Sequence, residues 1–399
     1  MDQKRKENLA FASKAVYYAP ESASQSIGMP IYMSSSFQYD AESYQRVVEG
    51  ERKAVNIYGR CGNPSEYAFE EQIAAIESAD SCLATASGMA AIAITLFGLL
   101  KSGDHIVCDW TTYSSTHEML DHRLTDYGIT TTFVDTANIE AVAAAIQPNT
   151  KVLYFETIAN PSMKVPAIPP LVELAHRHGI VVVCDNTFAS PWLIRPLEWG
   201  VDIVVESATK FIGGHNDAIG GTISMKSKLL PADFLEQIRW NTMVKWGAPL
   251  SPFNAWLLLR GVQTLDVRME RVCRTAITLA RHFESHPKVR RVWYPGLESH
   301  PQHDVALKQI PQFGGMMTFE VRDGETAVSV LDSLQLATFA ASLGGVRTTT
   351  QIPATMAFLD IPAEQRAQMN ISDGMIRVSV GLEAPQDLIA DFDQALARI

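Results

Sequence analysis

Two segments place reactive side chains directly after apolar runs of the sequence. In Glu206-Ser-Ala-Thr-Lys210 a lysine follows two small hydroxyl residues, Ser207 and Thr209. Lys210 is either a solvated side chain just past a strand or a Schiff-base lysine with hydroxyl groups placed for a phosphate. Asp185 also follows an apolar run, and a buried carboxylate needs a cationic partner such as a protonated pyridine nitrogen. The alternative is that Asp185 caps the next turn.

A third segment, Thr85-Ala-Ser-Gly-Met-Ala90, has small residues where a helix is expected to start. The free N–H groups of a helix start favour an anion, so this segment is a candidate phosphate site. The pattern is weak by itself, because many helices begin with serine.

These segments fall within a regular alternation of strands and helices that starts near residue 66. Strands rich in Val and Ile alternating with amphipathic helices predict a mostly parallel sheet covered on both faces, and such sheets bind ligands at the carboxyl ends of their strands. The expected strands are 82–86, 105–109, 130–135, 151–157, 180–184 and 202–206, and the expected helices are 67–77, 89–100, 116–127, 139–146 and 169–178.

The two ends of the chain have a different character. The segment 27–39 contains Gly28, Pro30 and three consecutive serines, which indicates an irregular arm. A long helix over 255–285, followed by strand-like runs at 289–294, 315–321 and 375–380, indicates a smaller α+β domain. We therefore expect three parts: an arm over 1–62, a large α/β domain over 63–261 and a C-terminal α+β domain over 262–399.

Composition excludes several classes of protein. The 399 residues are 47% apolar and 19% charged, which suits two folded domains, and the net charge of −11 without a basic tract argues against nucleic acid. Five dispersed cysteines without a CxxC pair predict neither a disulfide framework nor a metal site. The longest apolar run, 89–100, is too short to cross a membrane, and the charged N-terminal residues contain no signal-peptide pattern. These features predict a cytoplasmic protein.

Six motifs in this order resemble the pyridoxal-phosphate enzymes of cysteine and methionine metabolism: SGMAAI, YFETIANP, DNTF, SATKFIGGH, SPFNAWLLLRG and IRVSVGLE. That family includes cystathionine lyases and synthase, methionine γ-lyase and O-acylhomoserine sulfhydrylases. The resemblance covers nearly the whole chain. It implies a type I aminotransferase-like fold, pyridoxal 5′-phosphate as cofactor, and an amino-acid substrate. It also implies a homotetramer, built as a dimer of dimers, whose active sites are shared between subunits.

The resemblance implies roles around the cofactor. Lys210 forms the Schiff base, Asp185 pairs with the pyridine nitrogen, Tyr113 stacks on the ring, and Asn160 lies near the ring hydroxyl. The residues implied near the phosphate are Ser87, Gly88, Met89, Ser207 and Thr209, with Tyr58 and Arg60 reaching across from the neighbouring subunit.

The substrate side of the resemblance is less uniform. Arg377 matches the arginine that binds the substrate α-carboxylate, a role that suits a bidentate guanidinium, and Ser342 lies in the family's substrate loop. The alternative for Arg377 is a surface arginine on an edge strand. Arg347 stands where glutamate is usual, and Ser115 stands where methionine γ-lyases often have cysteine.

Glu118 is the departure with the clearest chemical consequence. It lies five residues after Tyr113, where cystathionine-processing members have an arginine that resembles a clamp for a distal carboxylate. A glutamate there would repel a carboxylate and attract a cation. The alternative is a solvated residue early in a helix, where glutamate suits the helix dipole.

These features predict a lyase that eliminates a heteroatom leaving group from Cγ, with canavanine as candidate substrate. Lys210 would remove the α-proton and Tyr113 would serve as acid or base. The alternatives are a methionine or cystathionine γ-lyase and a γ-replacement transferase. A nucleotide-binding oxidoreductase is disfavoured because no GxGxxG follows the first strand.

Overall fold

The computed structural model describes residues 8–17, 26–51, 55–310, 312–359 and 361–399. Its larger sheet has seven strands in the order β1-β7-β6-β5-β4-β2-β3. The strands are β1 Ser81–Thr85, β2 His105–Asp109, β3 Thr130–Val134, β4 Thr150–Glu156, β5 Val181–Asp185, β6 Ile203–Glu206 and β7 Gly221–Met225. Strands β3, β2, β4, β5 and β6 are parallel, which confirms the expected mostly parallel sheet.

Strand β7 was not predicted, and it changes the edge of the sheet. It returns immediately after the segment that carries Lys210 and lies antiparallel between β6 and β1. The first strand in sequence therefore lies at the edge of the sheet, separated from the parallel strands by β7.

Both faces of the large sheet are covered, because consecutive residues of its strands pack alternately into two different apolar cores. Leu83, Val152 and Val183 belong to one apolar core, whereas their chain neighbours Ala84 and Leu153 belong to another. Helix α5 Gly88–Leu99 contributes to the first core, and helices α4 Pro64–Glu77 and α8 Ile168–Arg177 contribute to the second. Successive side chains of a strand point to opposite faces, so near-continuous apolar strands require a core on each side.

The connections on this side of the molecule are short helical segments. They are α6 Ser114–Glu118, a π-helical turn Met119–Arg123, a 3₁₀ turn Thr125–Tyr127, α7 Ile139–Ala145, α9 Ser190–Leu193, a 3₁₀ turn Pro196–Trp199, α10 Phe234–Ile238, a π-helical turn Arg239–Met243 and α11 Val244–Trp246. The helix expected over 116–127 is thus three short segments with different hydrogen-bond patterns.

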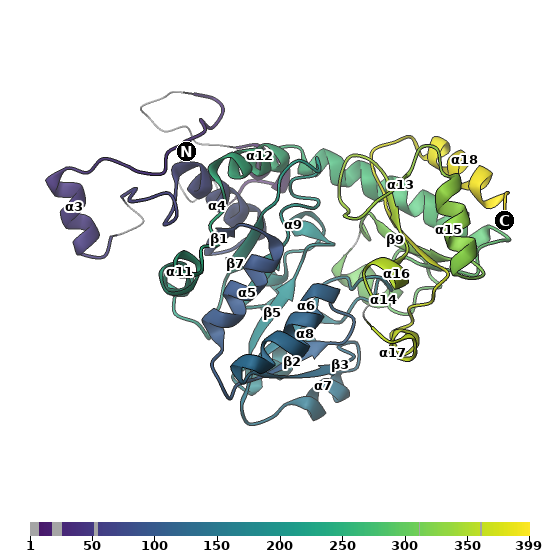
Figure 1. Ribbon diagram of the computed structural model, residues 1–399, viewed down its shortest axis with the longest axis horizontal. Coiled ribbons are helices and arrows are strands. Elements are labelled where there is room, and N and C mark those ends of the chain that lie inside the picture. Colours follow the sequence, from purple (N-terminus) through teal and green to yellow (C-terminus); the bar gives the residue numbers. More distant parts are fainter. Residues whose placement is uncertain (1–7, 18–25, 52–54, 311, 360) are drawn as a thin grey trace.

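The smaller domain is built on a five-stranded sheet in the order β10-β11-β12-β9-β8. Its strands are β8 Arg291–Trp293, β9 Met316–Glu320, β10 Thr338–Phe339, β11 Thr349–Gln351 and β12 Met375–Ser379, and its helices are α14 His303–Gln309, α15 Gly324–Ser333, α16 Pro353–Met356, α17 Ala363–Gln368 and α18 Pro385–Leu396. Figure 1 shows this domain beside the large sheet, with α13 Leu265–Ser285 running along the smaller domain, where it packs against β8 and β9.

The single helix expected over 255–285 is wrong. The structure has α12 Pro252–Val262 and α13 Leu265–Ser285, with a break at Gln263 and Thr264. The Thr264 N–H donates to the Gly261 carbonyl oxygen at 3.1 Å, and the buried Arg268 also donates to that carbonyl at 2.8 Å. A carbonyl engaged in this way does not accept the next helical hydrogen bond, so the helix stops and restarts.

The N-terminal part contains α2 Phe11–Val16 and α3 Ala41–Val48. Helix α3 has no buried residue and projects away from the body of the molecule at the end opposite the C-terminus (Figure 1). Within the described ranges, no helix is both long and apolar enough to cross a membrane. The domain boundaries at 62/63 and 261/262 stay predictions.

Candidate active site

Lys210 lies in the loop that follows β6, and its amine is enclosed by the smaller domain. Nζ donates a hydrogen bond to Ser342 Oγ at 2.9 Å. Burial, together with the nearby Arg377 guanidinium, lowers the pKa of Lys210 to about 8. Both effects disfavour the ammonium form, so about a tenth of this lysine carries a nucleophilic neutral amine at pH 7, far more than for an ordinary lysine.

Asp185 ends β5 and is buried without a cationic partner. Oδ1 accepts from the Thr187 N–H at 2.9 Å, and Oδ2 accepts from the Tyr154 hydroxyl at 3.4 Å. Within the described residues, no lysine, arginine or histidine forms an ion pair with this carboxylate, and burial raises the pKa of Asp185. Asp185 therefore does cap the turn at Thr187, as the alternative expected. The capping bond does not neutralise the buried carboxylate, so the site can still accept a cation.

The loops that carry Asp185 and Lys210 are joined directly. The Ser207 N–H donates to Thr187 Oγ1 at 2.8 Å. Thr209 Oγ1 donates to the Gly220 carbonyl oxygen at 3.2 Å and accepts from the Gly220 N–H at 3.1 Å. These bonds set the spacing between the two strand ends and fold the lysine loop back towards β7.

The start of α5 forms a close-packed cradle against the lysine loop. Ser87 is the N-cap, with Oγ accepting from the Ala90 N–H at 3.1 Å. A Cβ on Gly88 would lie 2.7 Å from Ser207 Cβ, and a Cβ on Gly221 would lie 2.2 Å from the Ser87 carbonyl oxygen. The helix start therefore presents backbone N–H groups beside serine hydroxyls, which suits a phosphate.

Arg377 on β12 is a buried cation that contacts only neutral acceptors. Its Nη1 donates to Asn160 Oδ1 at 3.1 Å, and Nη2 donates to the Ser342 carbonyl oxygen at 3.2 Å and to Gln351 Oε1. Burial lowers the pKa of Arg377 to about 10, and in the part of the chain described it has no carboxylate partner. The surface-arginine alternative is thus excluded, and the site is suited to an incoming carboxylate.

Tyr113 is held at its backbone, and the residue as a whole is 43% exposed. The Tyr113 N–H donates to Glu156 Oε1 at 2.5 Å, and the Thr112 hydroxyl donates to the same oxygen at 3.1 Å. Glu156 is buried, and this burial and the charge of Asp185 raise its pKa to about 8. The Tyr113 hydroxyl also interacts electrostatically with the Arg377 guanidinium, so the two groups lie in the same site.

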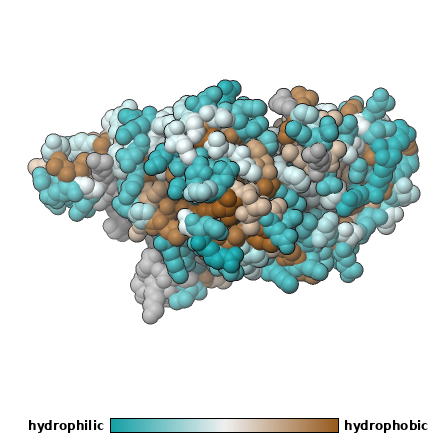
Figure 2. All heavy atoms as spheres, turned by 90° about the horizontal axis from the view of Figure 1, so that it is seen from below, coloured by the Kyte–Doolittle hydropathy of each residue, from teal (hydrophilic) through white to brown (hydrophobic). Residues whose placement is uncertain are grey.

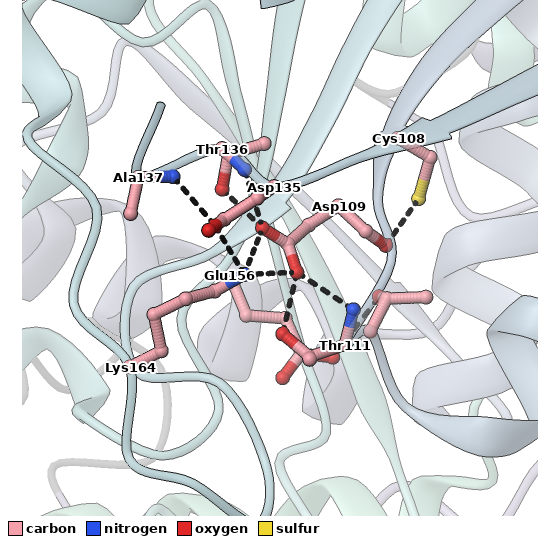
Figure 3. A network of polar contacts seen from close by, with 9 residues as sticks. Cys108, Asp109, Thr111, Asp135, Thr136, Ala137, Glu156 and Lys164 are labelled. Carbon is pink, nitrogen blue, oxygen red and sulfur yellow. Dashed lines mark hydrogen bonds and ion pairs between the residues drawn. The ribbon is translucent and has the colours of Figure 1, made fainter. Parts of the chain in front are cut away.

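A second polar network fixes the turn just before Tyr113 (Figure 3). Asp109 accepts from the Thr111 N–H at 2.7 Å and from the Thr136 N–H at 3.0 Å. Lys164 Nζ lies 2.8 Å from Asp109 and 2.9 Å from Asp135, so one buried ammonium joins the ends of β2 and β3. This network positions the turn, and none of its groups contacts Lys210.

Three predicted site residues, Tyr58, Arg60 and Glu118, contact groups other than Lys210 within this chain, and so does Arg347, which was noted only as a departure from the family pattern. Arg60 donates to the Val244 carbonyl oxygen at 2.7 Å, and Tyr58 forms an isolated bridge with Ser36 in the N-terminal part. Arg347 is exposed, with a hydrogen bond to Thr338. Glu118, at the end of α6, has a 52% exposed side chain 3.5 Å from the Arg123 guanidinium.

The remaining predicted residues lie with the site. Met89 is the second residue of α5, and its sulfur accepts from the Thr116 hydroxyl at 3.8 Å. The sequence reasoning did not single out Glu156, Tyr154 or Gln351. The first two lie in the quoted YFETIANP motif, but Gln351 had no signal, because its partner Arg377 lies on another strand.

These features fit a pyridoxal phosphate. Asp185 lacks a cation and can pair with the ring nitrogen, and Arg377 lacks an acid and can bind the substrate carboxylate. Lys210, partly buried and with a lowered pKa, can bind the aldehyde, and the glycine-lined start of α5 can hold the phosphate. The family model for Cys/Met metabolism PLP-dependent enzymes matches residues 13–397. The chain belongs to this family.

Relatives within the family are similar over nearly their whole length. An L-methionine gamma-lyase from Fusobacterium nucleatum subsp. polymorphum is 43% identical, with 94% of each chain covered. A cystathionine gamma-lyase from Bacillus subtilis (strain 168) is 39% identical, with 90% of this chain and 93% of the relative covered. The chain is thus a pyridoxal-phosphate-dependent lyase of cysteine and methionine metabolism.

Solved structures agree with the fold. The crystal structure of metB from Corynebacterium glutamicum has a TM-score of 0.92 at 36% identity and covers 98% of this chain and 99% of its own. A structure of an O-acetylhomoserine (thiol)-lyase from Campylobacter jejuni has a TM-score of 0.93 at 30% identity, covers 98% of this chain and 100% of its own, and carries N′-pyridoxyl-lysine-5′-monophosphate. Within the described ranges, no group of His, Cys, Asp or Glu is arranged to hold a metal ion.

Proposed function

We propose that this lyase eliminates a heteroatom leaving group from Cγ of an L-amino acid, and that canavanine is a substrate. The observation that supports this chemistry is that one loop residue, Ser342, contacts both the Lys210 amine and the Arg377 guanidinium. Ser342 accepts from Lys210 with its hydroxyl and from Arg377 with its carbonyl oxygen. An α-amino acid held by Arg377 would therefore present its Cα region to Lys210.

The cofactor's place follows from the partners that are left open. Lys210 would hold its aldehyde carbon, Asp185 its ring nitrogen, and Ser87, Gly88, Met89, Ser207 and Thr209 its phosphate. Asn160 would lie near its ring hydroxyl. Bound there, pyridoxal phosphate supplies an electron-withdrawing ring that stabilises negative charge next to the substrate's amino group.

The protein's own groups then move protons and orient the substrate. Arg377 binds the α-carboxylate, with Gln351 and Asn160 fixing the guanidinium plane. Lys210 takes the proton from Cα, since its lowered pKa makes the neutral amine available. A second proton then leaves Cβ, and the electron pair left there expels the group on Cγ. Tyr113 donates a proton to the leaving group on Cγ, because its ring is accessible and its backbone is anchored by Glu156.

Glu118 supports a cationic distal group. Its only ion pair in the described chain is with Arg123, and both side chains are more than half exposed, so water competes strongly with the pair. A guanidinium on the substrate can replace Arg123 at low cost. Canavanine carries a guanidine joined to Cγ through oxygen, so breaking the Cγ–O bond releases hydroxyguanidine. The unsaturated four-carbon skeleton then takes up water to give either homoserine or 2-oxobutyrate with ammonium.

A second candidate is methionine γ-elimination. It is favoured by relatives named L-methionine gamma-lyase at 43% and 42% identity. Methionine has no charge at its distal end, so it would make no use of Glu118. A γ-replacement reaction, as in a sulfhydrylase, stays an alternative that added sulfide would reveal.

Product analysis of the purified enzyme with canavanine, methionine, cystathionine and O-acetylhomoserine separates these candidates. We expect hydroxyguanidine from canavanine, and we expect Glu118→Gln to lower kcat/KM for canavanine about fivefold while leaving methionine unchanged. Asp121→Asn is the matched control, because it removes one exposed acid from the next helical turn. Equal effects of Glu118→Gln on both substrates, or no hydroxyguanidine at all, would remove canavanine from the proposal.

A further inference from the structure

A pair of buried carboxyls lies beneath the strand ends that carry Asp185 and Lys210. Glu77 ends α4 and is 0% exposed, whereas Glu206 ends β6 and is 2% exposed. The two side chains interact with each other, and Asn186 fixes Glu77 beside β6: its side chain donates to Glu77, and its N–H donates to the Val205 carbonyl oxygen at 3.0 Å. None of the proposed catalytic steps uses either residue.

Each carboxyl lacks a donor for one of its oxygens. Glu77 Oε2 and Glu206 Oε1 are buried and have no hydrogen-bond partner among the described residues. Their other oxygens are engaged: Glu77 Oε1 accepts from Asn186 Nδ2 at 3.3 Å, and Glu206 Oε2 accepts from the Thr222 hydroxyl at 3.4 Å. Two acceptors cannot bond each other without a hydrogen, so one proton between them is the arrangement that satisfies the pair.

The charges around the pair do not replace that proton. Arg195 interacts with Glu77, but its guanidinium is engaged by Glu198 at 2.9 Å. Asp185 acts on Glu206, and Cys184 lies close enough to feel both carboxylates, so the remaining ionisable neighbours are acidic. One negative charge on the pair is balanced in part by Arg195, whereas a second would be unbalanced in the core.

The pair is bonded to the segments that position the site. Besides Glu77, Asn186 Nδ2 bonds the Ile194 carbonyl oxygen at 3.0 Å, and Asn186 directly follows Asp185 in the chain. Glu206 directly precedes Ser207, whose N–H is bonded to Thr187. Repulsion between the two carboxyls would therefore act on the ends of β5 and β6 at the same time.

We propose that Glu77 and Glu206 share one proton and act as positioning residues that hold the Asp185 and Lys210 loops together, and that loss of this proton loosens the cofactor site. This positioning role does not depend on which amino acid is the substrate. Glu206→Gln is the informative variant, because its amide N–H₂ can donate to an ionised Glu77 and cannot itself titrate.

The sign of the pH effect is set by burial. Burial raises the pKa of Glu77 to about 7 and raises that of Glu206 well above its ordinary value, so the folded chain binds more protons than the unfolded chain above about pH 4.5. Stability from this pair is therefore present at low pH and falls as the pH rises through about 7, the pKa of Glu77, and beyond it. For Glu77 alone, the unfolding equilibrium changes on the order of 100-fold between its unfolded and folded pKa values.

The test is denaturant unfolding of the holoenzyme between about pH 5 and about pH 8, with cofactor retention measured on the same samples. We expect the wild type to lose stability and cofactor as the pH rises. Glu206→Gln and Glu77→Gln should lose part of that dependence, since buried Glu156 also contributes to it. Glu173→Gln, at a largely exposed glutamate, should keep it in full. Parallel pH profiles for Glu206→Gln and the wild type would overturn the proposal.

Infrared spectroscopy keeps the proposal testable if the variants fold poorly. Buried Glu156, whose pKa is about 8, contributes a carboxyl band to every sample, so the readout is the difference between the wild-type and Glu206→Gln spectra. At about pH 6 this difference should contain the band of a protonated buried carboxyl, which weakens as the pH rises above about 7. Identical carboxyl bands in the wild type and Glu206→Gln would contradict proton sharing. Neither readout requires turnover, so a wrong substrate leaves the result intact.

Discussion

Lys210 and Arg377 owe their chemistry to what surrounds them rather than to residue type alone. The lysine is buried beside a guanidinium, and the guanidinium is surrounded by neutral oxygens from Asn160, Ser342 and Gln351. Each group therefore carries an incomplete electrostatic environment that a cofactor or a substrate completes. The same logic applies to Asp185, a buried acid with only neutral donors.

The lowered pKa of Lys210 predicts how cofactor uptake depends on pH. Only the neutral amine attacks an aldehyde, so the rate at which the cofactor-free enzyme takes up pyridoxal phosphate should rise as the pH increases through about 8. Absorbance measured over time after mixing would report this rate. Lys226→Ala, at an exposed lysine after β7, should keep the wild-type profile, and Lys210→Ala should show no covalent uptake.

Arg377→Lys should weaken substrate binding more than it slows the chemical step. A lysine keeps the charge but loses the planar contacts to Asn160 and Gln351 and cannot bind a carboxylate through two parallel hydrogen bonds. We expect KM to rise about 10- to 100-fold, with a smaller change in kcat. Steady-state kinetics would measure both, and Arg347→Lys, an exposed arginine of the smaller domain, should change neither.

Short contacts between elements determine the shape of the phosphate cradle. Helix α5 begins directly against the lysine loop, and Gly88 and Gly221 leave no room for a side chain. The helix start therefore owes its exposed N–H groups to close backbone packing, with Ser87 capping the first turn.

Gly88→Ala should weaken the binding of the cofactor while leaving the fold intact. The added Cβ would lie 2.7 Å from Ser207 Cβ and push the helix start away from the loop. Overpacking costs about 1–3 kcal/mol, so the Kd for pyridoxal phosphate should rise about tenfold or more. Equilibrium titration of the cofactor-free protein would measure this. Gly28→Ala is the control, since a Cβ there has no atom within 4 Å, and an unchanged Kd for Gly88→Ala would contradict the cradle.

At the scale of the whole molecule, the chain exposes surface that suits a partner subunit. Figure 2 shows hydrophobic side chains gathered near the middle of one face between polar regions. Among the large apolar side chains that are exposed, Tyr58 is 46% and Trp246 is 55% exposed. Exposed apolar surface is common at interfaces, and the assembly through the N-terminal part that the family resemblance implies stays a prediction.

If Tyr58 and Arg60 complete a neighbouring site, two inactive variants should restore each other. Arg60→Ala removes the donated residue, Lys210→Ala removes the receiving one, and a mixed dimer would hold one intact site. Co-refolded equal mixtures should then regain about a quarter of the wild-type activity. Mixing Lys210→Ala with Asp185→Ala, whose defects both lie in the receiving site, is the control and should regain none. Absence of recovery in the first mixture would place Arg60 outside the shared site.

Much of the fold could be read from local pattern. Val- and Ile-rich runs placed the ends of the parallel strands within one or two residues, because a strand buried on both faces must be apolar along its whole length. Lys210, Asp185 and Ser87 stood out for a related reason: polar groups just after buried strands lie where parallel sheets bind ligands.

The tertiary structure decided which strands and helices pack together and which distant residues meet at the site. Nothing local marks β7 as the antiparallel strand between β6 and β1, or ends α12 at Val262, since both depend on hydrogen bonds to residues brought in by the fold. Arg377 and Asn160 are 217 residues apart, and Glu77 comes near Glu206 only because α4 packs against β1 and β7, and β7 lies next to β6 in the sheet. Residue type and spacing determine which groups can react. Their pKa values, and the charge partners that they lack, arise from burial and from neighbours distant in the chain.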